Sequence, residues 1–177
     1  MPHIHTKAGQ HDLAVTAYII RTDTPEPQAL VHMHRKLRRL LPVGGHVELD
    51  ETPWQAISHE IREESGYVFS DLKVLQPRVR LMNTRDVVQH PYPLSMNTHA
   101  VPENHFHTDI QYGFTAKSAP TTFIRDGESA DLRWVTQAEM NALDSSLIFM
   151  SVVDVYNFMF DQVLREWEEV PVSEFAL

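Results

Sequence analysis

The order of apolar and polar residues predicts strands at the start of the chain, then a mixture of helices and strands. Residues 12–21 form a nearly continuous apolar run of the kind found in buried strands. A turn with two prolines separates this run from residues 29–34, so we expect the two segments to form a hairpin. Residues 105–116 predict a central strand, and residues 72–82 predict another, with a bend at Pro77.

Residues 53–65 carry the signals of a helix with marked ends. Thr52 is a good N-cap, Pro53 suits the first helical position, and Gln55 completes a capping box with Thr52. Gly66 can take the left-handed conformation just past the last turn. At 100° per residue, three apolar side chains fall on one face and three carboxylates fall on a neighbouring arc. The apolar residues are Trp54, Ile57 and Ile61, and the carboxylates are those of Glu60, Glu63 and Glu64.

The clustered carboxylates indicate a function other than solubility. Glu60 and Glu64 lie one turn apart, and like charges at that spacing weaken a helix by about 0.2–0.5 kcal/mol. Carboxylate oxygens are the ligands that a hard cation such as Mg²⁺ prefers. A solvated acidic face is the alternative for an arbitrary pair of glutamates, but the residues around this helix favour a cation site.

The last part of the chain predicts two helices. A capping box of Thr136 with Glu139 opens a helix that continues to about residue 143. Residues 146–168 carry an apolar stripe at steps of four and three, which predicts a long helix packed on the sheet. A homodimer seam is the alternative use of this helix, because three further apolar side chains lie off the stripe: Met150, Phe158 and Met159.

This order of elements predicts the α/β class, with an α/β/α sandwich around a mixed β-sheet and a long C-terminal helix. The 177 residues suit one domain, with a core at about 12–143 and the C-terminal helix at about 146–168. Residues 83–102 are rich in Pro, Asn and His and predict a long loop, with a short strand at 86–89.

Composition limits the partners of the protein. The net charge of −9 argues against a general nucleic-acid binder. The absence of cysteine excludes disulfides, thiolate zinc sites and cysteine nucleophiles. No apolar run approaches the roughly 20 residues of a membrane span, and no signal-peptide pattern is present, so we expect a cytoplasmic protein without a membrane partner. The histidines near the start of the chain, His3, His5 and His11, favour an edge segment over a metal site.

Residues 45–67 match a fixed pattern, G-x5-E-x7-R-E-U-x-E-E-x-G-U, in which U is a bulky apolar residue. The matching positions are Gly45, Glu51, Glu60, Glu63, Glu64 and Gly66. This match of 23 residues resembles the Nudix box, the signature of the Nudix hydrolase superfamily. One position departs from the pattern, because His59 stands where the family has Arg, and the charge of a histidine depends on pH. The resemblance covers about residues 12–143 and implies the same α/β/α architecture.

The resemblance implies hydrolysis of a diphosphate linkage, typically in a nucleoside diphosphate derivative. Mg²⁺, with Mn²⁺ as a substitute, would neutralise phosphate charge and activate water. By the matched positions, the metal ligands would be Glu60, Glu63, Glu64 and the carbonyl of Gly44. Glu51 and His59 would support the metal shell, and Glu63 or Glu64 would also orient or deprotonate the attacking water.

Further candidate residues lie outside this motif. A basic run just before it would meet substrate phosphates through Arg35, Lys36, Arg38 and Arg39, with a solvated loop as the alternative. His46 would contact a phosphate or cap the glycine loop. Glu128, in the loop at 119–129, would be a base or an extra metal ligand, because several family members carry a glutamate there, with a solvated loop residue as the alternative.

The run His105, His107 and Asp109 places three potential metal ligands on one face of a strand. We favour a polar network beneath the sheet over a metal site for this run.

The alternative function is a catalytically weak Nudix-fold module that binds or senses a nucleotide, and only His59 favours it. Isopentenyl diphosphate isomerases share the fold but use a cysteine that this chain lacks. An enzyme acting on RNA ends is disfavoured by the acidic net charge. The sequence leaves the substrate open among oxidised nucleoside triphosphates, ADP-ribose, dinucleotide polyphosphates and nucleotide sugars. We expect specificity to lie in the loops at 83–105 and 119–129.

Overall fold

A computed structural model describes residues 6–82, 84–101 and 105–177, so the predictions for His3 and His5 fall outside the described part of the chain. Nine strands of this part form one sheet. They are β1 His11–Arg21, β2 Gln28–His34, β3 Arg39–Leu41, β4 Val43–His46, β5 Leu72–Gln76, β6 Ser95–Val101, β7 His105–Ala116, β8 Leu132–Thr136 and β9 Glu168–Pro171.

The sheet is mixed, as predicted. Its main order is β3-β2-β1-β7-β5-β9, with β4 paired to β1, β6 to β7 and β8 to β2. Strands β1 and β7 run parallel over their whole length, from His11 opposite Phe106 to Arg21 opposite Ala116. All the other strand pairs are antiparallel.

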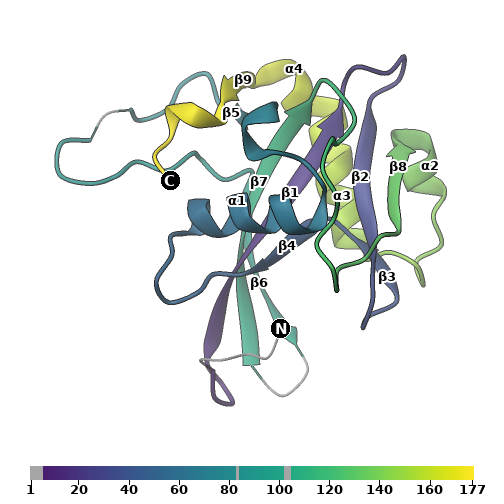
Figure 1. Cartoon of the computed structure of the whole chain (residues 1–177), viewed down its shortest axis with the longest axis horizontal. Coiled ribbons are helices and arrows are strands. Elements are labelled where there is room, and N and C mark those ends of the chain that lie inside the picture. The colour runs from purple at the N-terminus through teal and green to yellow at the C-terminus, as the bar shows by residue number, and fades with distance from the viewer. Residues whose placement is uncertain (1–5, 83, 102–104) are drawn as a thin grey trace.

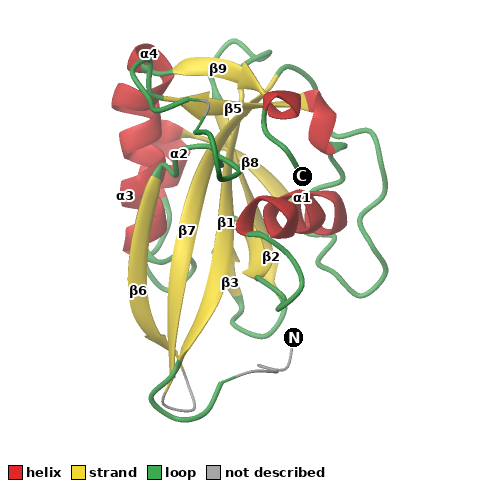
Figure 2. Ribbon diagram, turned by 90° about the vertical axis from the view of Figure 1, so that its left-hand side faces the viewer, coloured by secondary structure: helices red, strands yellow, loops and turns green. Residues whose placement is uncertain are grey.

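Helices cover both faces of the sheet, which confirms the α/β/α sandwich (Figures 1 and 2). Helix α1, Pro53–Glu64, lies on one face, and the C-terminal helical segment lies on the other. That segment consists of α3 Met150–Phe158, the π-helical turn η2 Met159–Val163 and α4 Leu164–Glu166. The remaining helices are the short α2 Gln137–Ala142 and the 3-10 turns η1 Phe69–Asp71 and η3 Val172–Glu174.

Strand β1 is buried on both faces, which explains its nearly continuous apolar sequence. Its successive side chains point to opposite faces of the sheet. Val15, Ala17 and Ile19 pack in the cluster beneath α1, whereas Tyr18 and Ile20 pack against the C-terminal helix. The strand therefore holds the two halves of the core together.

The C-terminal helix differs in detail from the prediction. The chain forms a turn in which the Leu147 amide donates to the Asp144 carbonyl, so the helix begins at Met150. Met159, the first residue of the π-helical turn, is fully buried, although the predicted stripe did not include it. Met150 and Phe158 keep 54% and 38% of their surface exposed, and their use in a homodimer stays a prediction.

Three predictions about strands were wrong. The strand predicted for 72–82 ends at Gln76, because Pro77 has no amide hydrogen for the ladder. The short strand at 86–89 is absent, and the edge strand β6 lies later in that region. Strand β6 is polar and mostly exposed, so its apolar pattern is weak. The C-terminal helix ends at Glu166 rather than at residue 168, and it is followed by strand β9, which was not predicted.

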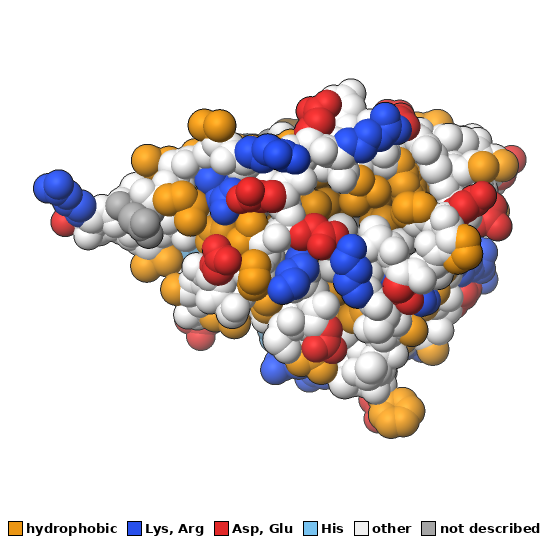
Figure 3. Space-filling model, turned by 90° about the horizontal axis from the view of Figure 1, so that it is seen from above, with side chains coloured by type: hydrophobic (Ala, Val, Ile, Leu, Met, Phe, Trp, Pro, Cys, Tyr) orange, Lys and Arg blue, Asp and Glu red, His pale blue; other side chains and the backbone are white. Residues whose placement is uncertain are grey.

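Within the described residues, no helix combines the length and apolar character that a membrane crossing requires. On the face seen in Figure 3, acidic and basic side chains are mixed, with apolar side chains between them.

Candidate active site

Helix α1 positions the acidic residues because both of its ends are fixed locally. The Thr52 hydroxyl accepts from the Gln55 amide at 3.2 Å, and the Gln55 side chain accepts from the Thr52 amide at 2.8 Å. Gly66 ends the helix with a φ of +72°. These contacts confirm the predicted capping box and the glycine stop. Three apolar residues then anchor one face of the helix in the core: Trp54, Ile57 and Ile61.

The same anchoring presses Glu60 and Glu64 against the sheet, where only 7% and 8% of their surfaces stay exposed. Strand β4 makes room for them with two glycines. The Gly44 amide donates to Glu64 Oε2 at 3.1 Å. A Cβ atom on Gly45 would lie 2.0 Å from Glu60 Oε1, so a side chain there would displace the carboxylate. Gly45 therefore serves the close approach of Glu60, whereas Gly44 allows the close approach of the Val15 carbonyl on β1 and donates its amide to Glu64.

Burial changes the protonation of both carboxyl groups. It raises the pKa of Glu60 from 4.5 to about 7, and the charge of His59 only partly offsets this. Burial also raises the pKa of Glu64 to about 8, against the opposing hydrogen bond from Gly44. A hydrogen bond with Glu128 favours the protonated form of Glu64 as well. Without a cation, this site therefore holds protons near neutral pH.

His32 on β2 is a neighbour of the site that the sequence did not single out. Its Nε2 lies 3.6 Å from Glu64 Oε2. Burial and the nearby charge of His34 lower the pKa of His32 to about 4, so its imidazole is neutral near pH 7. The contact is therefore a polar contact rather than an ion pair.

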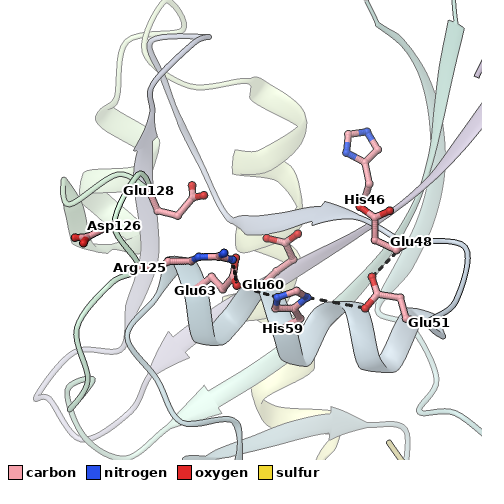
Figure 4. Close-up of a pocket in the computed structure, with 9 residues that line it drawn as sticks. All are labelled: His46, Glu48, Glu51, His59, Glu60, Glu63, Arg125, Asp126 and Glu128. Atoms are coloured by element: carbon pink, nitrogen blue, oxygen red, sulfur yellow. Dashed lines mark hydrogen bonds and ion pairs between the residues drawn. The ribbon is translucent and has the colours of Figure 1, made fainter. Parts of the chain in front are cut away.

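The outer carboxylates form a chain of contacts along the helix (Figure 4). His59 Nε2 lies 2.8 Å from Glu63 Oε1, and its Nδ1 lies 4.0 Å from Glu51 Oε2. Glu51 also accepts from the Glu48 amide at 3.0 Å. The imidazole thus bridges two acidic residues on either side of it.

Arg125 is a further partner of Glu63 at this site. Its guanidinium forms an ion pair with Glu63 Oε1, and the Arg125 amide donates to the Glu63 carbonyl at 3.0 Å. The sequence analysis did not single out Arg125. The only available signal was a basic residue inside an acidic loop.

These side chains enclose a pocket of about 320 Å³ (Figure 4). Glu128 and Asp126 reach it from the loop before β8, opposite α1. The residues that line it are His46, Glu48, Glu51, His59, Glu60, Glu63, Arg125, Asp126 and Glu128.

The predicted phosphate-binding residues take different positions. Arg35 donates to the Gly127 carbonyl and so holds the loop that carries Glu128. Arg39 faces the C-terminal helix, because it donates to the Ser145 carbonyl at 3.2 Å and its guanidinium lies 4.4 Å from the Phe149 ring. Lys36 and Arg38 are exposed in the turn between β2 and β3. None of these four residues lines the pocket, where the cation is Arg125.

His46 is part of the pocket wall, but its ring turns away from the carboxylates (Figure 4). Neighbouring residues of a strand point to opposite faces. Because the open side of Gly45 faces Glu60, the side chain of His46 lies on the other face of the sheet. Its Nε2 lies 3.2 Å from Nε2 of His107 there. The structure places the His46 ring beside His107, and its contact with a phosphate stays a prediction.

The donor set fits a hard divalent cation. Glu60 and Glu63 of α1 face Glu128 of the loop across the pocket, and Glu64 lies in hydrogen-bond contact with Glu128. A nearby cation would oppose the raised pKa of Glu60 and of Glu64. A side chain at position 45 would collide with the Glu60 carboxylate, so glycine keeps the space for it. Bound Mg²⁺ would be held by oxygen atoms, as its chemistry demands.

Comparison with solved structures supports the fold. A Nudix family hydrolase from Clostridium perfringens has a TM-score of 0.64 at 23% identity, over 84% of this chain and 97% of the other. An Ap4A hydrolase from C. elegans has a TM-score of 0.54 at 16% identity, over 88% of this chain and 94% of the other. The Nudix domain of Shewanella oneidensis NrtR complexed with ADP ribose has a TM-score of 0.54 at 14% identity, over 89% and 91% of the two chains.

No curated protein matches this sequence. The family model of the NUDIX domain, in contrast, matches residues 10–150, which is most of the chain. The match includes the whole of α1 and the glycine loop before it. The chain therefore belongs to the Nudix family, whose hydrolases act on phosphoanhydride bonds.

Proposed function

We propose that this protein is a Mg²⁺-dependent pyrophosphohydrolase that cleaves the diphosphate linkage of a nucleoside diphosphate derivative. The observation that carries the proposal is the convergence of Glu60, Glu63 and Glu128 on one pocket, with buried Glu64 next to it in hydrogen-bond contact with Glu128. Such a concentration of carboxylates, with raised pKa values, is stable in the charged form only beside a cation.

Glu60, Glu63, Glu64 and the Gly44 carbonyl are the proposed ligands of Mg²⁺, with Mn²⁺ as a substitute. When bound, the ion neutralises phosphate charge and lowers the pKa of water. Glu51 and His59 hold the orientation of these ligands, since His59 contacts both Glu51 and Glu63.

Glu128 and Arg125 have different proposed roles in the hydrolysis. Glu128 stands on the wall facing α1, where it can orient a water molecule and accept its proton. The water oxygen forms a new bond to phosphorus, and the anhydride P–O bond breaks toward the leaving phosphate group. Arg125 lines the same pocket and can exchange its contact with Glu63 for a contact with a phosphate oxygen.

The names of similar structures guide the choice of substrates to test. They include an Ap4A hydrolase, a UDP-X diphosphatase and a Nudix domain complexed with ADP ribose. A dinucleotide polyphosphate, a UDP sugar and ADP-ribose are therefore the first compounds of the panel, followed by oxidised nucleoside triphosphates.

The test is incubation of the pure protein with Mg²⁺ and this panel, with products identified by mass spectrometry. Reaction in ¹⁸O-labelled water shows which phosphorus receives the oxygen. Glu64→Gln and Glu128→Gln should each lose most of the rate while keeping the melting curve of a folded protein. Glu26→Gln, at an exposed position in the turn between β1 and β2, is the matched control and should keep the full rate.

Turnover that is unchanged in Glu64→Gln would overturn the proposal. If no compound turns over but one of them raises the melting temperature in the presence of Mg²⁺, the nucleotide-sensing alternative replaces the hydrolase proposal.

A further inference from the structure

A second cluster of potential metal ligands lies on the face of the sheet opposite α1. Asp12, His105 and His107 each place one ligand atom so that all three atoms lie within 4.8 Å of one another. His46 adjoins this group, because its Nε2 is 3.2 Å from Nε2 of His107. The cluster contains imidazole nitrogens, in contrast to the carboxylate ligands proposed for Mg²⁺ beside α1.

Strand pairing brings these residues together. Asp12 on β1 pairs with His107 on β7, and Ala14 on β1 pairs with His46 on β4. Paired residues share a face of the sheet, and His105 lies on that face because it is two positions from His107. Ala14 is small, so the rings of His46 and His107 meet across β1 with centroids 4.7 Å apart.

The distances suit an ion between the donors. In a tetrahedral zinc site with bonds of about 2.0–2.2 Å, neighbouring ligand atoms lie about 3.3–3.6 Å apart. Within the cluster, His105 Nε2 is 3.7 Å from Asp12 Oδ2. This distance is too long for a direct hydrogen bond between the two atoms and close to the spacing around a metal.

The cluster is built into the sheet rather than lying loosely on its surface. Asp12 and His105 expose only 8% and 3% of their surfaces. The Thr6 hydroxyl donates to Asp12 Oδ2 at 2.9 Å and so orients the carboxylate. Placing a divalent ion here would match a buried carboxylate with a positive charge.

Asp109, which the sequence grouped with the two histidines, has other partners. It accepts from Thr16 Oγ1 at 2.9 Å and from the Gln111 amide group at 2.8 Å. Asp12 takes its place beside His105 and His107.

We propose that Asp12, His105 and His107 form a second metal site for an ion that favours imidazole ligands, such as Zn²⁺. Two imidazoles and one carboxylate suit this class of ion, whereas Mg²⁺ favours oxygen ligands. The three donors come from β1 and β7, so a bound ion would tie these two strands together. The proposal is independent of the hydrolase function.

The experiment uses untagged full-length protein carrying Glu63→Gln and Glu64→Gln, so that the pocket beside α1 does not contribute bound metal. After removal of metals with a chelator, the protein is mixed with Zn²⁺ or Co²⁺ alone and freed of excess ion by gel filtration. We expect about one bound ion per chain and a visible Co²⁺ absorption band of the tetrahedral type. At 100 times the dissociation constant, Zn²⁺ should raise the melting temperature by about 5–10 °C.

His107→Gln and Asp12→Asn should each remove the bound ion, the Co²⁺ band and the rise in melting temperature. His11→Gln is the matched control. His11 lies on the opposite face of the same strand end and contacts Thr108 Oγ1 at 2.8 Å, so its replacement should leave all three signals unchanged.

The proposal would be overturned if the starting protein, which carries Glu63→Gln and Glu64→Gln, did not retain Zn²⁺ or Co²⁺. Equal retention of the ion after His107→Gln would also overturn it. In that case the cluster is a hydrogen-bonded network without a metal. Because the parent protein is tested first, the result does not depend on the folding of the variants.

Discussion

Replacement of Glu64 by glutamine should stabilise the metal-free protein, and the gain should grow as the pH rises from about 4.5 to about 8. Glu64 is buried against Gly44, and its pKa is raised from 4.5 to about 8. In the unfolded chain the carboxyl group ionises near pH 4.5, whereas in the folded protein it stays protonated up to about pH 8. Stability from this group is therefore fully present below pH 4.5 and is lost as the pH rises to about 8.

The size of the effect follows from this pH window. Each pH unit between the two pKa values costs about 1.4 kcal/mol, so the full window corresponds to a few kcal/mol. Glutamine has nearly the same shape, keeps an oxygen for the Gly44 amide and carries no charge to bury. For a chain of this length, 1 kcal/mol changes the melting temperature by about 2–4 °C. We expect Glu64→Gln to melt about 5–15 °C above the parent at pH 8.

The assay is thermal unfolding at pH 5 and pH 8, in EDTA and in Mg²⁺. The two proteins should melt at similar temperatures at pH 5 in EDTA. Saturating Mg²⁺ should raise the melting temperature of the parent at pH 8 and have a much smaller effect on Glu64→Gln. Glu26→Gln should follow the parent throughout, because Glu26 is exposed.

A glutamine variant that is less stable than the parent at pH 8, or equally stabilised at both pH values, would refute the argument. The first result would mean that neighbouring groups already offset the cost of burying the charged Glu64 carboxylate. The second would mean that the gain comes from packing rather than from ionisation.

Three further predictions test the metal site and the core beneath the C-terminal helix. Gly45→Ala should displace Glu60 and reduce the Mg²⁺-induced rise in melting temperature by at least half, because the new Cβ would lie 2.0 Å from the carboxylate oxygen. His59→Ala should lower Mg²⁺ affinity about tenfold through the loss of its contact with Glu63. His59→Arg should restore the affinity with less dependence on pH, since arginine stays charged, and Mg²⁺ titration by calorimetry measures both variants. Tyr156→Phe should lower the free energy of unfolding by about 1–2 kcal/mol in urea titration, because the buried phenol donates to a carbonyl of β2 at 2.5 Å.

Each of these predictions has a result that contradicts it. If Mg²⁺ raised the melting temperature of Gly45→Ala as much as that of the parent protein, Glu60 would have moved without a loss of metal binding. If His59→Ala bound Mg²⁺ with unchanged affinity, the imidazole would not support the metal ligands. A Tyr156→Phe protein as stable as its parent would mean that water or another donor replaces the phenol at the carbonyl.

The sequence by itself determined the features that depend on neighbouring residues. The ends of α1 follow from Thr52, Gln55 and Gly66, and its two faces follow from the spacing of apolar and acidic side chains. The strands at β1 and β7 were also predicted, because a central parallel strand is apolar over most of its length. These local signals were enough to indicate an α/β/α sandwich and a cluster of carboxylates.

Only the tertiary structure decided which distant residues meet. The long parallel pairing of β1 with β7 brings Asp12 beside His107, and the loop before β8 brings Arg125 to Glu63. The strand alternation beginning at Gly45 turns His46 away from the pocket, which its position after the glycine pair did not reveal. Pairing partners are chosen by register and packing across the whole sheet, and no local pattern specifies them. For the same reason the sequence located the acidic site, while the folded sheet created the histidine cluster on its other face.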